Sequence, residues 1–401
     1  MTEKNLTVDG VYNAAFNLKP IIRKTDLIQA ENLGDNIYLK TENLQKTGSF
    51  KIRGAYNKLS KLKKEEKNKG LVTAAYANNA LGLALSCKKL DIKITIFMPE
   101  QSPLFKVENI KSYGAEVVLV GNSYEESLDK AKSFCKENNE VFFDSSEDYD
   151  YILAYSSLGL EILDQLVGVD IVVAPVGSGS LIGGLSFLIK SLKPDTKIIG
   201  VEAENAASMK KSIEAGKIQK LDKVSTFSDA IAIKKPNELA FDLCKKYVDE
   251  IVTVSEDEIA SAILVLLEKQ KLMCEGAGAV SFAAIMHEKI DIKNKKTVAL
   301  LSGGNLDVNI LSRIIKRGLE KSGRNTNLKI ELTDKPGELV AVSKIIADSG
   351  ANVIGVEYNT LEKPNEFFSC VLNIKCETRN KNHENEIKNT LKNKGFILQE
   401  N

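Results

Sequence analysis

The feature that most constrains the fold is the alternation of short β-branched runs with longer amphipathic segments through the first 320 residues. The run at 171–176 is a buried strand by length and composition, whereas 151–166 repeats its apolar residues at helical spacing. This alternation is typical of a doubly wound α/β fold. The predicted strands are 37–40, 71–75, 92–98, 117–120, 171–176, 198–202, 251–254 and 297–301, and the predicted helices include 80–90, 103–113, 124–137, 151–166 and 256–268.

A different pattern follows a break at 321–327, which reads Lys-Ser-Gly-Arg-Asn-Thr-Asn. Beyond the break, strand-like and helix-like runs follow in the order βαββαβ. An Asp-Lys-Pro-Gly turn at 334–337 precedes the first helix. We therefore predict a large domain at 1–320, a linker at 321–327 and a separate small α+β domain at 328–401. The expected elements of the small domain are strands 328–332, 352–358 and 367–374 and helices 338–349 and 384–394.

Charge and cysteine usage narrow the class of protein. The 55 basic and 54 acidic side chains leave a formal net charge of +1, so nothing in the composition favours nucleic acid or an anionic membrane as a partner. The six cysteines are scattered without the spacing of a zinc site or a disulfide framework. We see no signal peptide and no apolar run long enough to span a bilayer, so we expect a cytoplasmic protein.

The segment 41–57 combines a helix start with a lysine. Its apolar residues recur at helical spacing from Ile52 onward, and either Ser49 or Thr47 can cap the helix, which places Lys51 in the first turn. The positive end of the helix dipole and partial burial both disfavour an ammonium group there. A neutral amine is a nucleophile that forms Schiff bases with carbonyl compounds such as pyridoxal phosphate. The alternative is a solvated surface lysine.

Two glycine-containing loops follow predicted strands, where catalytic groups gather in such folds. Strand 171–176 leads into Gly177-Ser178-Gly179-Ser180-Leu181, whose small residues let backbone N–H groups converge on a phosphate at a helix start. Glycine also serves tight turns and close packing, so this loop alone is weak evidence. Strand 297–301 leads into Ser302-Gly303-Gly304-Asn305, where the Ser302 hydroxyl can hydrogen-bond a ring nitrogen or cap the next helix.

These segments, together with Gly200-Val201-Glu202 and Glu275-Gly276-Ala277-Gly278-Ala279, carry a family resemblance. Over about residues 10–320 the chain resembles the threonine dehydratase (threonine ammonia-lyase) family, and the segment at 42–55 is the most specific match. The resemblance implies the tryptophan synthase β-like fold of pyridoxal phosphate enzymes (fold type II), with two doubly wound lobes. The tail at 328–401 resembles an ACT amino-acid-sensing domain, which is ferredoxin-like.

The resemblance also implies roles for single residues. Lys51 would hold pyridoxal 5′-phosphate as a Schiff base and, once freed, act as the general base at the substrate Cα. The remaining cofactor contacts would come from Phe50, Asn78, Gly177, Ser178, Gly179, Ser180, Leu181 and Ser302. The implied reaction converts threonine or serine into a 2-oxo acid and ammonia. For threonine the product would be 2-oxobutanoate, as in isoleucine biosynthesis.

The departures from the family lie on the substrate side. The family's Ser-Ala-Gly-Asn-His loop is here Ala75-Tyr76-Ala77-Asn78-Asn79, so a serine expected to hold the substrate carboxylate is missing. The family's Gly-Gln-Gly-Thr stretch is Ala154-Tyr155-Ser156-Ser157, and its Asp-Gly pair is Asp229-Ala230. The residues expected to face the substrate are therefore Ala75, Tyr76, Ala77, Asn79 and Tyr155.

Three functions are compatible with this division between kept and changed residues. The first is an ordinary threonine or serine dehydratase in which the changes compensate one another. The second is a related enzyme with a changed amino-acid substrate, or a racemase in which Tyr76 acts on the cofactor face opposite Lys51. The third is an amino-acid sensor without turnover, although a sensor has no need of a reactive lysine.

The sequence also bears on metal binding and on regulation by an amino-acid effector. Glu202 and Ala206 match cation ligands of some relatives, but Ser208 stands where a carboxylate would complete the site, so we predict no metal requirement. The ACT-like tail has Glu357-Tyr358-Asn359 where its relatives often carry histidine and arginine, so an amino-acid effector is a hypothesis. Because ACT-like modules pair, a homo-oligomer is expected.

Overall fold

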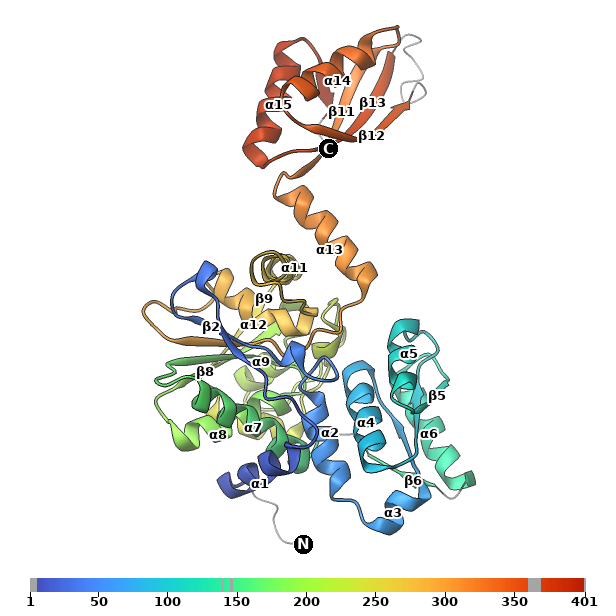
Figure 1. Ribbon diagram of the computed structural model, residues 1–401, viewed down its shortest axis with the longest axis vertical. Coiled ribbons are helices and arrows are strands. Elements are labelled where there is room, and N and C mark those ends of the chain that lie inside the picture. Colours follow the sequence, from blue (N-terminus) through green and yellow to red (C-terminus); the bar gives the residue numbers. More distant parts are fainter. Residues whose placement is uncertain (1–5, 139, 145–146, 360–368, 400–401) are drawn as a thin grey trace. The chain divides into compact units, whose positions relative to one another are not determined.

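The computed structural model of the chain describes residues 6–138, 140–144, 147–359 and 369–399 (Figure 1). The chain divides into two compact units, Met1–Asp307 and Val308–Asn401, and each is described by itself. Within the described residues, no helix is both long and apolar enough to cross a membrane.

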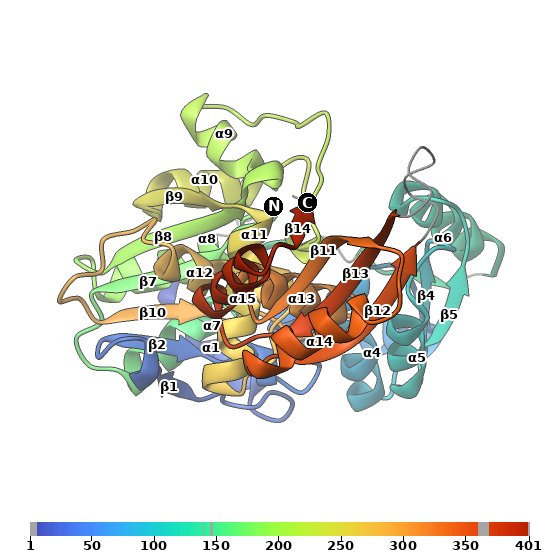
Figure 2. The ribbon, with the colours of Figure 1, turned by 90° about the horizontal axis from the view of Figure 1, so that it is seen from above.

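The first unit is built on two sheets, of which the larger has six strands in the order β1-β2-β10-β7-β8-β9, seen side by side in Figure 2. Only β1 runs antiparallel to its neighbour, and the other pairs are parallel. The inner strands β7 and β10 are buried on both faces, which explains their continuous β-branched runs. The strands are β1 Leu27–Gln29, β2 Ile37–Lys40, β7 Ile171–Pro175, β8 Lys197–Ala203, β9 Glu250–Val254 and β10 Thr297–Leu300.

The helices of this larger lobe pack mostly on one another and on the two faces of its sheet. α7 packs against α1, α2 and α8, and α12 lies against β7, β8 and β10. The core between them includes Leu158, Val172, Leu185, Ile198 and Val298, all fully buried. The helices are α1 Val8–Leu18, α7 Tyr149–Gln165, α8 Ser180–Leu192, α9 Ser208–Glu214, α10 Glu238–Tyr247, α11 Glu256–Val265 and α12 Gly276–Met286, with short turns η1 Glu31–Leu33, η2 Glu42–Leu44, η3 Glu204–Ala206, η4 Asp229–Ile231 and η5 Leu266–Gln270.

The smaller lobe of the first unit has a four-stranded parallel sheet in the order β5-β4-β3-β6. α2 packs against α4 of this lobe and against α7 of the larger lobe, so it lies where the two lobes meet. The elements are α2 Lys51–Ser60, α3 Lys64–Lys69, β3 Leu71–Ala74, α4 Ala77–Leu90, β4 Ile94–Met98, α5 Leu104–Ser112, β5 Glu116–Leu119, α6 Tyr124–Asn138 and β6 Val141–Phe142.

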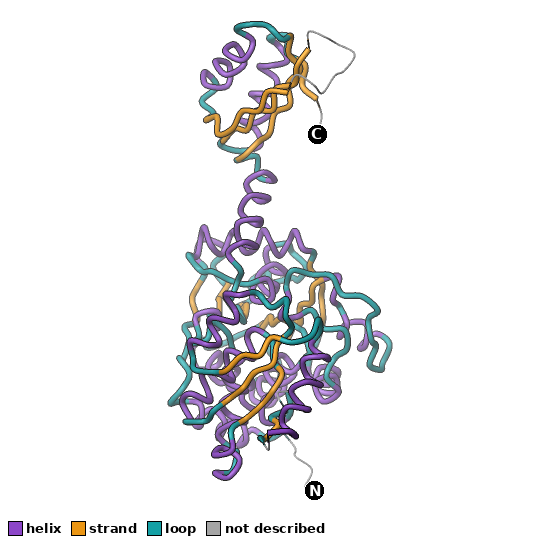
Figure 3. Tube along the Cα trace, turned by 90° about the vertical axis from the view of Figure 1, so that its right-hand side faces the viewer, coloured by secondary structure: helices purple, strands orange, loops and turns teal. Residues whose placement is uncertain are grey.

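The second unit begins with α13 and continues as an antiparallel sheet in the order β12-β13-β11-β14, with α14 and α15 packed together (Figure 3). Its core is formed by residues such as Leu328, Ile346, Leu372 and Ile387. The order of elements along the chain is βαββαβ, as in ferredoxin-like domains. The elements are α13 Val308–Lys321, β11 Asn325–Thr333, α14 Glu338–Asp348, β12 Asn352–Asn359, β13 Ser369–Glu377, α15 Lys381–Asn393 and β14 Ile397–Gln399.

The predicted α/β fold class is confirmed, and every predicted strand of the first 320 residues coincides with an observed one. The predicted boundary at 320 and the linker at 321–327 differ from the structure. The second unit starts at Val308, and residues 325–327 already pair with β13 as part of β11. Polar side chains at these positions suggested a linker, but edge-to-edge strand pairing is made by backbone groups and does not depend on them.

Candidate active site

The segment that precedes α2 is joined to the loop after β10 by main-chain hydrogen bonds. The Phe50 N–H donates to the Ser302 carbonyl at 3.2 Å, and the Gly304 N–H donates to the Gly48 carbonyl at 2.8 Å. Gly48 has a φ of +71°, and a side chain on it would lie 2.4 Å from Oδ1 of Asn305. Glycine is therefore required at position 48. This arrangement sets the start of α2 beside the carboxyl end of β10.

Lys51 is the first residue of α2, as predicted, but the predicted helix cap is wrong. Phe50 holds the cap position, and its side chain makes no capping hydrogen bond. Ser49 forms a bridge with Gly303, and its hydroxyl is buried without a hydrogen-bond partner among the described residues. Thr47 donates its hydroxyl to the Ser49 carbonyl at 3.4 Å. Pairing with the neighbouring loop thus outweighs local capping chemistry.

Two aromatic rings and one carboxylate surround the Lys51 amine. Its Nζ lies 5.1 Å from the ring centre of Phe50 and 5.8 Å from that of Tyr155, and these two rings meet edge to face at 4.7 Å. The same Nζ forms an ion pair with Oε1 of Glu147. The amine therefore lies against an anion as well as at the start of a helix. Sequence reasoning expected the dipole but missed Glu147.

Glu147 uses both carboxylate oxygens. Oε1 accepts a hydrogen bond from the Tyr155 hydroxyl at 3.1 Å, and Oε2 accepts one from the Ser178 hydroxyl at 2.6 Å. Burial alone would raise the pKa of Glu147, but the charge and hydrogen bond of Lys51 and the serine hydroxyls lower the pKa to about 2. The carboxylate is thus an anion at neutral pH.

The predicted phosphate loop lies between β7 and α8. Gly179 has a φ of +94°, and a side chain there would meet Cε of Met209 at 2.3 Å. α8 begins at Ser180, whose hydroxyl lies 3.3 Å from that of Ser178. The first N–H groups of a helix have no acceptor within it, so they and the two serines together suit an anion. Because the Ser178 hydroxyl already donates to the Glu147 carboxylate, the same donor set also fits another anion such as a cofactor phosphate.

The side-chain amide of Asn78, at the start of α4, is held from both ends. Its Nδ2 donates to Oε1 of Glu275 at 2.7 Å, and its Oδ1 accepts from Nδ2 of Asn305 at 2.7 Å. Asn305 also donates to the Thr47 carbonyl at 2.8 Å. Asn78 therefore has one Nδ2 hydrogen left for a ligand, in a fixed orientation. Burial, and next the charge of Asp229, raise the pKa of Glu275 to about 7.

Ser302 ends the set of predicted cofactor contacts. It is buried, follows the last residues of β10, and its hydroxyl makes only a long contact, 3.4 Å, with the Ala277 carbonyl. The Ser302 carbonyl accepts the N–H of Phe50, the residue before Lys51, so Ser302 pairs with the backbone at the start of α2. The structure thus brings Phe50, Lys51 and Ser302 together.

The predicted substrate residues lie at the end of β3 and on α7. Ala75 is buried, with its N–H directed to the Phe97 carbonyl at 3.4 Å, and Ala77 opens α4. The Asn79 N–H donates to the Tyr76 carbonyl at 2.9 Å. Tyr155, by contrast, joins the cofactor side because its hydroxyl contacts Glu147. Their roles toward a substrate stay predictions.

The Tyr76 side chain is 47 % exposed. Its ring lies 5.1 Å from the ring of Tyr124 on α6, with 32° between the two planes. Burial and the nearby Glu125 raise the pKa of Tyr76, so its phenol is a poor base at neutral pH. Close by, Lys106 of α5 forms an ion pair with Asp229 of η4 at 2.5 Å, which links the smaller lobe to the larger.

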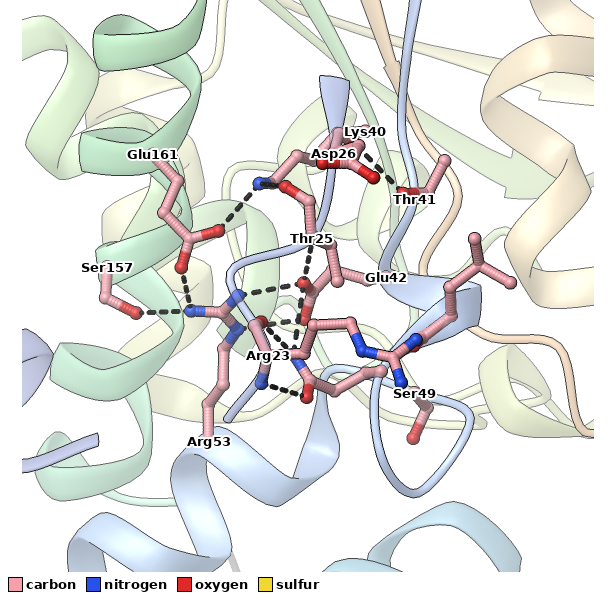
Figure 4. A network of polar contacts seen from close by, with 12 residues as sticks. Arg23, Thr25, Asp26, Lys40, Thr41, Glu42, Ser49, Arg53, Ser157 and Glu161 are labelled. Atoms are coloured by element: carbon pink, nitrogen blue, oxygen red, sulfur yellow. Dashed lines mark hydrogen bonds and ion pairs between the residues drawn. The ribbon is translucent and has the colours of Figure 1, made fainter. Parts of the chain in front are cut away.

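A buried network of charges fixes the other face of α2 (Figure 4). Arg53 is fully buried and donates to both carboxylate oxygens of Glu42 at 2.8 Å, to Glu161 at 2.7 Å and to Ser157 at 3.1 Å. Burial alone would raise the pKa of Glu42, but Arg53 holds it below the usual range. Lys40 completes the network through Glu161 at 2.6 Å. The helix that begins with Lys51 is therefore anchored by charge two residues further on.

Glu202, which the family resemblance matched to a cation ligand, accepts hydrogen bonds at the start of α9 in the structure. Its two carboxylate oxygens accept the N–H groups of Met209 and Lys210 at 2.9 and 2.8 Å, at the start of α9. Burial raises its pKa to about 7. Within the part of the chain that the structure describes, there is no cluster of three or more histidine, cysteine, aspartate or glutamate side chains suited to a metal ion.

Comparison with known proteins shows the family to which the chain belongs. Residues 18–303 match the family model described as pyridoxal-phosphate dependent enzyme. The chain is 43 % identical to the L-threonine ammonia-lyase of Thermotoga maritima over 395 residues, which covers 98 % of each chain.

Solved structures give the same relationship. The processed form of threonine deaminase isoform 2 from Solanum lycopersicum superposes with a TM-score of 0.72 at 33 % identity, over 78 % of this chain and 89 % of that one. Maize serine racemase also gives 0.72, at 28 % identity, over 78 % of this chain and 98 % of that one.

The chain therefore belongs to the family of pyridoxal-phosphate dependent enzymes, in its threonine ammonia-lyase (threonine dehydratase) branch. Its cofactor is pyridoxal 5′-phosphate, and its first unit has fold type II.

Proposed function

We propose that this protein is an ammonia-lyase that converts L-threonine or L-serine into a 2-oxo acid and ammonia. The observation that carries the proposal is the position of Lys51. It begins a helix whose preceding residue pairs with Ser302, and through Glu147 it is linked to Ser178 of the predicted phosphate loop, in a chain that matches an L-threonine ammonia-lyase over nearly its whole length. When bound, the cofactor supplies the electron sink that makes the substrate Cα proton acidic.

The residues of the chain would then have separate tasks. Lys51 holds the cofactor through its amine and accepts the proton from the substrate Cα. The hydroxyls of Ser178 and Ser180, with the first N–H groups of α8, bind the phosphate. Asn78 donates its remaining Nδ2 hydrogen toward the ring, and Ser302 faces the ring nitrogen with a group that carries no charge.

A direct assay tests the activity. The purified protein, supplied with pyridoxal phosphate, is incubated with L-threonine and with L-serine while 2-oxo acid and ammonia are measured. We expect both products in equal amounts, and their loss in Lys51→Ala but not in Lys61→Ala, which alters a surface ion pair with Asp150. A panel of amino acids that gives no 2-oxo acid would leave the fold and cofactor but refute this reaction.

We also propose that the second unit is an ACT-like regulatory domain that binds an amino-acid effector and contributes to a homo-oligomer. Its βαββαβ order and its strand order β12-β13-β11-β14 support this. Initial rates measured across isoleucine, valine and threonine titrations test the effector, and sedimentation tests the oligomer. A reducing, cytoplasmic location is supported by the six cysteines, all buried and unbridged. A role in isoleucine biosynthesis depends on threonine being the substrate.

A further inference from the structure

Glu147 lies between β6 and α7, and its carboxylate contacts Ser178 of the predicted phosphate loop. Its Oε2 accepts the Ser178 hydroxyl at 2.6 Å, and its Oε1 contacts both Lys51 and the Tyr155 hydroxyl. The side chain is 11 % exposed. The carboxylate thus contacts a donor of the loop 177–181 and the reactive amine at once.

The backbone of Glu147 is held in this position too. Nδ2 of Asn237 donates to the Glu147 carbonyl at 3.0 Å, while Oδ1 of Asn237 accepts the Ala240 N–H at 3.1 Å and so caps α10. The carbonyl and both carboxylate oxygens are therefore held by residues of α2 and α7, by the loop before α8 and by the residue that caps α10. This is a defined arrangement rather than a loose surface side chain.

A cofactor phosphate needs the same partners. The Ser178 hydroxyl has one proton and cannot donate it to a carboxylate and a phosphate together. Lys51 cannot bond to the cofactor's carbonyl carbon while it stays paired with Glu147. Two anions side by side in a buried pocket also repel one another strongly. Occupancy by Glu147 and by the phosphate is mutually exclusive.

We propose that Glu147 is an internal competitor of the cofactor: its carboxylate holds the phosphate end of the site until pyridoxal phosphate enters, and loading requires it to leave Ser178 and Lys51. This rests on the cofactor of the family and on the proposed cofactor residues, not on which amino acid is the substrate. The carboxylate keeps Lys51 and the serine hydroxyls paired with an anion in the cofactor-free protein. The ligand that replaces it is a phosphate group.

The test compares three probes on cofactor-free protein: inorganic phosphate, pyridoxal, which lacks the phosphate, and pyridoxal phosphate. Dissociation constants are measured by calorimetry for phosphate and by absorbance for the two pyridoxal compounds. The variants are wild type, Glu147→Gln and the control Asp150→Asn, which removes the same charge three residues away from a pair with Lys61. We expect Glu147→Gln to bind inorganic phosphate and pyridoxal phosphate at least about tenfold more tightly, and Asp150→Asn to match wild type.

Pyridoxal distinguishes the release of Lys51 from the release of Ser178. Its affinity reports the release of Lys51 alone, so the gain of Glu147→Gln should be larger for pyridoxal phosphate than for pyridoxal. Phosphate affinity that is unchanged or weaker in Glu147→Gln overturns the proposal, and so does an equal gain for both pyridoxal compounds. If Glu147→Gln does not fold, Glu147→Asp, whose carboxylate is withdrawn by one methylene, must show tighter phosphate binding. Absence of lyase activity in every variant would refute the proposed reaction without touching this result.

Discussion

Arg53 donates two hydrogen bonds to Glu42, from Nε to Oε2 and from Nη2 to Oε1, each 2.8 Å long. Both side chains are fully buried, and the guanidinium also pairs with Glu161. Such a bidentate pair fixes direction as well as distance. The first turn of α2, with Lys51 at its start, is therefore oriented by charged groups of the larger lobe.

Removing this arginine should cost much of the stability of the first unit. Arg53→Met leaves the Glu42 carboxylate buried without its ion-pair partner and leaves Glu161 paired with Lys40 alone. Breaking a buried pair in this way costs about 3–5 kcal/mol. Urea unfolding of the cofactor-free protein measures the change. The control is Lys24→Met, which removes the exposed pair with Asp164 and should change stability little. Equal effects of the two substitutions would contradict a special role for the buried network.

Gly179 should tolerate no side chain. Its φ of +94° costs an L-residue about 1–2 kcal/mol. In Gly179→Ala the flexible end of the Met209 side chain must move aside, and the added Cβ would also lie 3.1 Å from Cβ of Ala240, so we expect a further cost of about 1 kcal/mol.

Gly216→Ala is the matched control for Gly179→Ala. Gly216 has a φ of +69° but open space around the added Cβ, so the backbone strain is similar and the overlap is absent. Denaturation gives the difference in stability, and phosphate binding should weaken only in Gly179→Ala. A larger loss in Gly216→Ala would show that packing against Met209 does not limit this position.

Glu275 should make the stability of the cofactor-free protein depend on pH. Burial and the charge of Asp229 raise the pKa of Glu275 from 4.5 to about 7, so between these values the folded protein binds more protons than the unfolded chain. The contribution of Glu275 is present at low pH and is lost as the pH rises toward 7. Glu275→Gln should therefore flatten the fall in unfolding free energy between pH 5 and pH 7.5, which urea titrations at four pH values would detect. A steeper fall in the variant would refute the assignment.

Tyr76→Phe tests the racemase hypothesis. The substitution keeps the ring that lies against Tyr124 and removes only the hydroxyl, which the raised pKa keeps protonated at neutral pH. We expect 2-oxo acid formation within about twofold of wild type, because removal of a general acid or base costs about a hundredfold or more. Chiral chromatography after incubation with L-serine should show no D-serine. D-serine from wild type that disappears in Tyr76→Phe would instead establish Tyr76 as a catalytic residue.

Most of the fold could be predicted from sequence because a buried parallel strand such as β7 requires an unbroken apolar run, and the helix that follows requires apolar residues at regular spacing. The position of the Lys51 and Ser302 loops followed from the rule that functional loops gather at the carboxyl ends of such strands. In the second unit, α13 was missed. Its apolar residues Ile310 and Ile314 lie at helical spacing, but the break predicted at 321–327 placed this segment at the end of the first domain.

The partners within the site could not be predicted in the same way. Glu147 lies 96 residues from Lys51 in a polar stretch between elements, and Glu275 lies 197 residues from Asn78. A side-chain contact across such distances leaves no periodic signal. The wrong cap at Ser49 has the same origin, since its backbone is paired with Gly303, far along the chain.

Glu161 follows Arg53 by 108 residues in the chain, so the ribosome synthesises it much later than α2. A growing chain exposes Lys51 long before it exposes the carboxylate that completes the anchor of α2. Until the end of α7 has been synthesised, the reactive amine is carried by a helix whose orientation is not yet determined. A fixed orientation of α2 therefore requires that the chain has been synthesised at least as far as Glu161.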